Sequence, residues 1–358
     1  VSIAGTGDYI DLGSEAWTVS GTWTNATTSA SWDAGTGTVT FDSATGGTMT
    51  FAGGNLGENE FFNVTFTSSA GTSQTFTMGR SLRPGGTLTI TDTAGGTILS
   101  KPDTFDIGLS AGGPLVISGT VASGLVAGAG GNIDGIAFTD VTISTATAYI
   151  AMANDDFTVS GTWTNSSTNA SWDAGTGTVT FNAAAGATMT FAGANLSEDE
   201  FFNVTFASSA AGSQTFTMAT RGLRLGGALV IDSTTILAKA TFTLTVGTTF
   251  TLGAGEANAL TSTSGAVTVG TNVSVADATA YIDFGSETWT VSGTWTNSTT
   301  SASWDAGSGT VTFDGATGGT MTFAGANLAE DEFSSVTFES SGAASQTFTM
   351  ATRGLRWG

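Results

Sequence analysis

One long motif occurs three times in this chain, and this repetition limits the possible folds more than any other feature. The string Gly-Thr-Trp-Thr-Asn centred on Trp23 returns at Trp163 and at Trp295, so the copies are widely and almost evenly spaced. A second string, Ser-Trp-Asp-Ala-Gly, follows in each copy. Repeats of this kind are expected to stack on their neighbours and bury a shared core. The predicted repeat units are residues 1–140, residues 141–272 and a truncated third unit, residues 273–358.

Within each unit, short segments alternate apolar residues with threonine. Gly-Thr-Val-Thr-Phe, Gly-Thr-Met-Thr-Phe, Gln-Thr-Phe-Thr-Met and Gly-Thr-Leu-Thr-Ile are typical examples. Alternation with a period of two indicates a β-strand with one buried face, and β-branched threonine suits the solvated face. Glycine, asparagine, aspartate and serine separate the segments, as turn residues do. The sequence therefore predicts an all-β protein.

Two architectures fit a string of short strands, a β-solenoid and a row of tandem β-sandwich domains. Outward threonines can stack in ladders between the coils of a solenoid, and proline, with 3 residues, is rare. Sandwich domains are usually joined by a recognisable linker, and none is evident between the copies. The β-solenoid is the favoured prediction, with tandem β-sandwiches as the alternative.

The composition removes most common enzyme chemistries. The chain has no cysteine and no histidine, so a disulfide, a zinc–thiolate site and a Ser–His–Asp triad are all excluded. Only 8 lysines and arginines are present and the net charge is −21, which disfavours nucleic acid as a partner. No apolar stretch is long enough for a membrane-spanning helix. We predict a protein that is not an enzyme, carries no cofactor and has no membrane span in this segment.

The repeated strings Gly-Thr-Trp-Thr-Asn, Phe-Phe-Asn-Val-Thr-Phe and Gly-Gly-Thr-Leu-Thr-Ile resemble repeats of large prokaryotic surface proteins, the adhesin-like and surface-layer-like proteins. The resemblance extends over nearly the whole chain. It implies a right-handed parallel β-helix and a location outside the cell or on its surface. The wide spacing of the copies also implies several coils per repeat.

Charged residues recur at matching positions in the three copies and are candidates for self-association. We expect arginines of one copy to meet carboxylates of a neighbouring copy, along the chain or between chains, as bidentate pairs. The alternative is a set of exposed loops with weak ion pairs. The candidates are Arg80, Arg83, Arg221, Arg224, Arg353, Arg356, Glu58, Glu60, Glu198, Asp199, Glu200, Glu330, Asp331 and Glu332.

Two further ligands are suggested by oxygen-rich loops. Calcium could bind the acidic triplets or the Trp-Asp-Ala-Gly loops, although Asp33, Asp173 and Asp305 are better explained by Asx turns. The equivalent sequons at Asn25, Asn165 and Asn297 are the best candidates for glycosylation, against a simple turn role for asparagine. The repeated tryptophans could stack sugars, but a core position is favoured.

Together these features predict a non-enzymatic extracellular structural protein. It would form a cell-surface fibre, a sheath or a surface layer, or the stalk of a giant adhesin, and would associate with copies of itself. The alternative is a carbohydrate-binding adhesin that uses exposed tryptophans, or Tyr9, Tyr149 and Tyr281, to bind glycans. A glycan-cleaving enzyme rests on fold analogy alone, and three similar copies argue against a single active site.

Overall fold

The structure is a computed structural model of the 358-residue chain. It describes residues 1–44, 47–52, 60–101, 109–128, 136–183, 199–208, 213–232, 234–253, 258–315, 319–326, 328–329, 331–342, 345–351 and 354–358.

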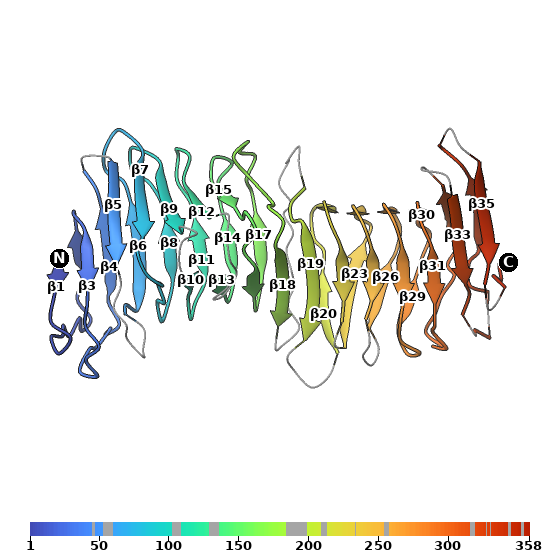
Figure 1. Cartoon of the computed structure of the whole chain (residues 1–358), viewed down its shortest axis with the longest axis horizontal. Coiled ribbons are helices and arrows are strands. Elements are labelled where there is room, and N and C mark those ends of the chain that lie inside the picture. The colour runs from blue at the N-terminus through green and yellow to red at the C-terminus, as the bar shows by residue number, and fades with distance from the viewer. Residues whose placement is uncertain are drawn as a thin grey trace. The chain divides into compact units, whose positions relative to one another are not determined.

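The described residues form strands and turns, with no helix among them. Neighbouring strands pair in parallel and stack as a β-solenoid of about 12 turns (Figure 1). The predicted solenoid is thereby confirmed. The sandwich alternative is wrong, because its sheets would be antiparallel.

The chain divides into two compact units. Unit 1 holds Val1–Thr178 and Ala194–Glu198, and unit 2 holds Val179–Gly193 and Asp199–Gly358. This division does not follow the boundaries of the sequence repeats. Strand β18 (Thr178–Ala183) contains the point of division.

Unit 1 has three sets of stacked strands, named here sheets 1, 2 and 3. Sheet 1 consists of β1 (Ser2–Ile3), β3 (Trp23–Asn25), β5 (Gly47–Ala52), β7 (Gln74–Met78), β9 (Thr97–Lys101), β12 (Gly124–Ala127) and β15 (Tyr149–Ala151). Sheet 2 consists of β2 (Trp17–Val19), β4 (Thr38–Asp42), β6 (Asn63–Thr67), β8 (Leu88–Ile90), β11 (Leu115–Ile117), β14 (Val141–Ile143) and β17 (Trp163–Asn165). Sheet 3 consists of β10 (Leu109–Ser110), β13 (Ile136–Phe138) and β16 (Phe157–Val159).

Unit 2 also has three sets, named sheets 4, 5 and 6. Sheet 4 consists of β19 (Asn203–Ser208), β22 (Leu229–Ile231), β25 (Phe250–Leu252), β28 (Val273–Val275), β31 (Trp295–Asn297), β33 (Gly319–Ala324) and β35 (Gln346–Met350). Sheet 5 consists of β20 (Gln214–Thr217), β23 (Thr235–Ala240), β26 (Ala259–Ser262) and β29 (Tyr281–Asp283). Sheet 6 consists of β21 (Leu223–Leu225), β24 (Leu244–Val246), β27 (Ala266–Val269), β30 (Thr288–Val291), β32 (Thr310–Asp314) and β34 (Ser335–Glu339).

The length of one turn varies along the solenoid. Leu229 pairs with Phe250 on the next turn, whereas Trp295 pairs with Phe323, so the second of these turns is the longer. The strands keep their register, and the loops absorb the difference in length. Apolar side chains point inward at every second position, and their neighbours point outward, as period-two patterning requires.

Phenylalanines stack between adjacent turns at the same place in each repeat. The ring centroids of Phe41 and Phe66 lie 5.2 Å apart with an interplanar angle of 17°. The equivalent rings Phe181 and Phe206 lie 5.3 Å apart at 20°, and Phe313 and Phe338 lie 5.5 Å apart at 21°. Such pairs add about 0.5–1.5 kcal/mol each to the free energy of area burial. The repeat therefore encodes the same ring contact three times, in the core for the first two pairs and with an exposed Phe338 in the third.

The repeat is not a whole number of turns. In unit 1, Trp23 lies on β3 of sheet 1, whereas its counterpart Trp163 lies on β17 of sheet 2. Five turns lead from β3 to β15 of sheet 1, and β16 and β17 follow on the other two sheets. Equivalent residues of the first two copies therefore face different sides of unit 1.

Candidate functional site

A buried glutamate joins two tryptophans and an asparagine in the first repeat. Trp23 Nε1 and Asn25 Nδ2 donate to Glu60 Oε1 at 2.9 and 2.8 Å. Trp32 Nε1 donates to the backbone carbonyl of Glu60 at 2.9 Å. Glu60 is only 4% exposed, so these donors replace the water that its carboxylate would otherwise bind. We call these four residues the Glu60 cluster.

The third repeat builds the same arrangement with the same atoms, the Glu332 cluster. Trp295 Nε1 and Asn297 Nδ2 donate to Glu332 Oε1 at 3.0 and 2.9 Å, and Trp304 Nε1 donates to the Glu332 carbonyl at 3.0 Å. Burial raises the pKa of Glu332, and the hydrogen bonds from Asn297 and Trp295 partly oppose this rise. In each cluster, hydrogen bonds to the glutamate connect the loop that carries it to the strand that carries the first tryptophan.

The three glycosylation candidates are buried. Asn25, Asn165 and Asn297 are 1%, 0% and 3% exposed. Their Oδ1 atoms accept hydrogen bonds from the backbone amides two residues further on, and Nδ2 of Asn25 and of Asn297 donates to a glutamate. A glycan on these side chains would break those bonds in the folded chain, and glycosylation stays a prediction. Their turn role, the alternative reading of the sequons, is confirmed.

The acidic assembly candidates separate into buried and exposed residues. Glu60, Glu200 and Glu332 are 4%, 5% and 2% exposed, so they are core residues and the prediction of surface contacts is wrong for them. Asp199 and Asp331 are partly exposed and pair with arginines. Glu58, Glu198, Glu330 and Arg353 lie outside the described residues.

Two of the described arginines pair with a carboxylate of their own repeat. Arg224 Nε lies 2.7 Å from Asp199 Oδ1, and Arg356 Nε lies 4.0 Å from Asp331 Oδ1. In both pairs the carboxylate comes from the same copy, and pairing with a neighbouring copy or another chain stays a prediction. Both arginine side chains are more than half exposed, so each pair contributes at most about 1 kcal/mol. Arg83 and Arg221 are also exposed and Arg80 is half-buried.

Sequence reasoning missed a buried ion pair in unit 2. Lys239 Nζ lies 2.8 Å from Glu287 Oε2, and both side chains have no exposed surface. The ammonium also donates to the carbonyls of Phe242 and Ser264 at 2.6 and 2.8 Å, so all three of its hydrogens are used. Trp289 Nε1 donates to Glu287 Oε1 at 2.6 Å.

The electrostatics of Glu287 follow from this burial. Desolvation raises the pKa of Glu287, and the hydrogen bond from Lys239, that from Ser262 and the charge of Lys239 oppose the rise. A corresponding pair in unit 1 joins Lys101 Nζ to Asp155 Oδ2 at 2.8 Å, with side chains 5% and 1% exposed. Breaking either pair would leave a charge buried without a partner.

The aspartates of the Trp-Asp-Ala-Gly loops form Asx turns, as predicted. Oδ1 of Asp33, Asp173 and Asp305 each accepts a hydrogen bond of 2.8 Å from the amide of the glycine two residues further on. That glycine has a positive φ of 59° to 61° in the three copies. Among the described residues, no group of three or more acidic side chains could hold a metal ion. Calcium binding stays a prediction.

Most of the tryptophans fill the core, as favoured, whereas Trp17 is half-buried and Trp357 is exposed. Trp23, Trp163 and Trp295 are at most 1% exposed, and Trp32, Trp172 and Trp304 at most 5%. Of the tyrosines, Tyr9 is exposed, Tyr281 is half-buried and Tyr149 is buried, and burial raises the pKa of Tyr149.

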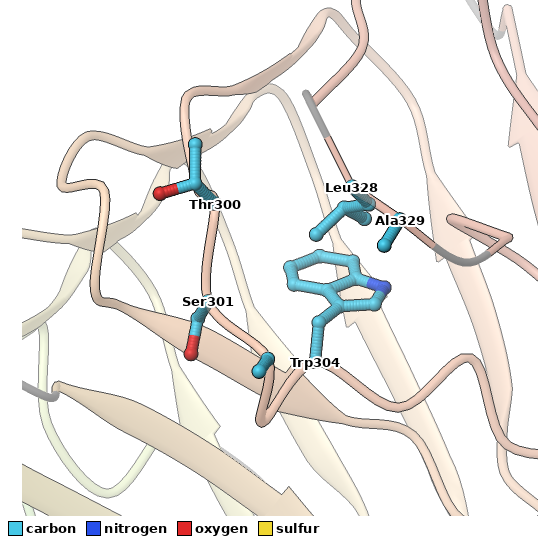
Figure 2. Close-up of a pocket in the computed structure, with 6 residues that line it drawn as sticks. Thr300, Ser301, Trp304, Leu328 and Ala329 are labelled. Carbon is cyan, nitrogen blue, oxygen red and sulfur yellow. The ribbon is translucent and has the colours of Figure 1, made fainter.

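A small pocket lies over Trp304 in the third repeat (Figure 2). Its volume is about 120 Å³, and it is lined by Thr300, Ser301, Ala302, Trp304, Leu328 and Ala329. Leu328 and Ala329 lie over the indole on one side, and the two hydroxyl residues lie on the other. Trp304 is only 4% exposed, so the ring offers little surface on which a sugar could stack.

Comparison of the chain with protein-family models, with curated protein sequences and with solved structures finds no match. Among the residues that the structure describes, no helix is long and apolar enough to cross a membrane. The functional argument therefore rests on the chain's own residues.

Proposed function

We propose that this chain is a non-enzymatic structural protein of the cell exterior, a segment of a fibre, sheath, surface layer or adhesin stalk. The observation that carries the proposal is that repeated polar residues hold the core together. In the first and third copies, the tryptophan, asparagine and glutamate side chains that could have built a site are bonded to one another in the core.

Mechanically, the proposed role depends on contacts between successive turns. Hydrogen bonds between parallel strands join successive turns among the described residues. The stacked phenylalanines and the buried lysine pairs add side-chain contacts in the same direction. Contacts of this kind stiffen a solenoid along its stacking direction, because each turn holds its neighbours. Repetition of the unit would then set the length of the structure.

Electron microscopy of the native material, with and without a calcium chelator, tests the proposal. Ordered fibres or lattices would support a structural assembly, and their loss on chelation would show that calcium holds it together. Isolated rods would support a stalk. Globular particles that turn over a glycan substrate would overturn the proposal.

Self-association through the exposed arginines has its own test. The double variant Arg221→Glu and Arg224→Glu reverses two charges on an exposed edge of unit 2. If the arginines connect chains, this variant should sediment at a lower mass than the wild type at the same concentration. Unchanged sedimentation would exclude these arginines from the interface.

A further inference from the structure

Two parallel rows of hydroxyl side chains cross the outer face of sheet 2 in unit 1. The first row follows the register of β6, β8, β11, β14 and β17. The second row lies two residues further along each strand. We call these ten positions the hydroxyl array: Thr65, Thr89, Val116, Thr142 and Thr164 in the first row, and Thr67, Thr91, Ser118, Ser144 and Ser166 in the second.

The second row keeps the register beyond the ends of the short strands. The amides of Thr91, Ser118, Ser144 and Ser166 donate to the carbonyls of the adjacent turn at 2.8 to 3.0 Å, in the same ladder as the strands. Ser118 Oγ donates to Thr91 Oγ1 at 3.0 Å, which shows that neighbouring hydroxyls of this row face the same side. Nine of the ten positions of the array carry a hydroxyl, with Val116 as the exception, and of these nine residues only Thr67, at one end of the second row, is buried.

The array is a regular lattice because its backbone is regular. Neighbouring parallel strands lie about 4.8 Å apart, and alternate residues of a strand lie about 6.6 Å apart. Threonine is stiff about χ1, and its neighbours on both sides restrict it further. Thr65, Thr89, Thr142 and Thr164 are half-buried, so each is held on its flanks and open outward. The hydroxyls thus repeat in two dimensions with little conformational freedom to lose on binding.

The chemistry of the array suits ordered water. No charged residue occupies any of its ten positions, and the charged neighbour in register is Asp42, beside Thr67 at one end of the second row. Threonine presents a hydroxyl, which can take a place in a water lattice, beside a methyl group, which orders the water around it. The two repeats of the array approach the oxygen repeats on the faces of ordinary ice.

We propose that the hydroxyl array binds ice. Crystalline polysaccharide is the rival ligand for a flat polar surface, but sugars are commonly held on aromatic platforms, and the aromatic residues of these strands point inward. Phe66 and Trp163, which adjoin the array in sequence, are both 0% exposed. This activity goes beyond the proposed structural role and would turn one side of unit 1 into an ice-binding surface.

The test uses the full chain in three forms. The first is the wild type, and the second is the variant Thr89→Lys with Thr142→Lys, which places two long charged side chains in the first row. The control is Thr75→Lys in β7 of sheet 1, a half-buried threonine whose partner on the next turn is Ile98. Thermal hysteresis and ice-crystal shape are measured in a nanolitre osmometer, and circular dichroism verifies that each form is folded.

The expected result is faceted ice crystals and a measurable hysteresis for the wild type and for the control, with both lost in the double variant. A further variant, Thr89→Val with Thr142→Val, keeps the side-chain shape and should retain folding if the lysines disturb it. Round ice crystals and no hysteresis for the folded wild type would overturn the proposal. Retention on microcrystalline cellulose or chitin, without any effect on ice, would assign the array to a polysaccharide instead.

Discussion

Replacing Lys239 by methionine would leave the Glu287 carboxylate buried without its counter-ion. Methionine fills a similar volume, so the main loss is electrostatic. The ammonium contacts Glu287 Oε2 at 2.8 Å and two backbone carbonyls, and both charged side chains are fully buried. Removing one partner of such a pair typically costs about 3–5 kcal/mol. We expect a loss of this size in the free energy of unfolding at pH 7.

The loss should shrink as the pH falls. Burial already raises the pKa of Glu287, and Lys239 opposes that rise, so the variant should have a still higher folded pKa. Between the ordinary glutamate pKa of about 4.3 and this folded value, the folded state binds a proton that the unfolded state does not. Stability therefore increases with falling pH, by up to about 1.4 kcal/mol per pH unit. Between pH 7 and pH 5 the variant should therefore recover part of its loss.

Urea unfolding followed by circular dichroism at pH 7 and pH 5 gives both quantities, and hydrogen exchange of β23 locates the effect. The double variant Lys239→Met with Glu287→Gln removes both charges and should be more stable at pH 7 than Lys239→Met alone. Its stability should also lack the recovery at pH 5. A loss below about 1 kcal/mol for Lys239→Met at pH 7, or an equal loss at both pH values, would show that the pair is not held as an ion pair in the core.

Three further substitutions test other parts of the structure. Glu332→Gln should remove a carboxyl whose raised pKa favours the folded state at low pH, so the wild type should gain melting temperature over the variant between pH 7 and pH 5. Gly35→Ala should destabilise the chain by at least about 1–2 kcal/mol in urea, because Gly35 has a φ of 59° and a Cβ there would overlap the Gly13 carbonyl. Gly7→Ala is the control, since a Cβ at Gly7 meets nothing within 4 Å. Arg224→Glu should lower the melting temperature only slightly, because its exposed pair with Asp199 contributes at most about 1 kcal/mol, and a large drop would contradict that weak pairing.

The strand pattern and the aromatic core could be predicted from the sequence because both depend on local alternation. In β4, Val39 and Phe41 are 3% and 1% exposed, and the threonine between them is half-buried on the opposite face. Period two alone decides which residues point inward. The Asx turn at Asp33 was predictable for a similar reason, since aspartate bonds to an amide two residues further on.

The partners of the buried polar groups could not be predicted in this way. Glu60 accepts a hydrogen bond from Trp23, which lies far earlier in the sequence, and the turns between them differ in length along the solenoid. Sequence spacing therefore does not reveal which loop covers which strand. Glutamates in a polar loop are expected at the surface, and nothing local distinguishes Glu60 from its neighbours. The burial of Asn25 could not be predicted for the same reason, because its side chain bonds to that distant glutamate.

The burial of the two lysines could have been predicted from the period-two alternation. Lys101 follows Leu99 by two residues in β9, and Leu99 is fully buried, so alternation places the lysine on the inward face. Lys239 follows Leu237 in the same way in β23. A lysine in the core requires a carboxylate nearby. The candidates were the acidic residues two positions before an aromatic strand residue, Asp155 before Phe157 and Glu287 before Trp289.

Because the repeat is not a whole number of turns, equivalent residues of the first two copies lie on different sheets of unit 1. This offset decides which surfaces the solenoid can present to a partner. Thr164 belongs to the hydroxyl array on sheet 2, whereas its counterpart in the first copy, Thr24, lies on sheet 1. Equivalent loops of the first two copies therefore do not form one line along unit 1, and a partner cannot meet the same loop twice on one face. Continuous surfaces arise instead from non-equivalent residues of successive turns, which the parallel register brings together. Multivalent binding by unit 1 should thus depend on the stacking of coils and not on the period of the sequence repeat.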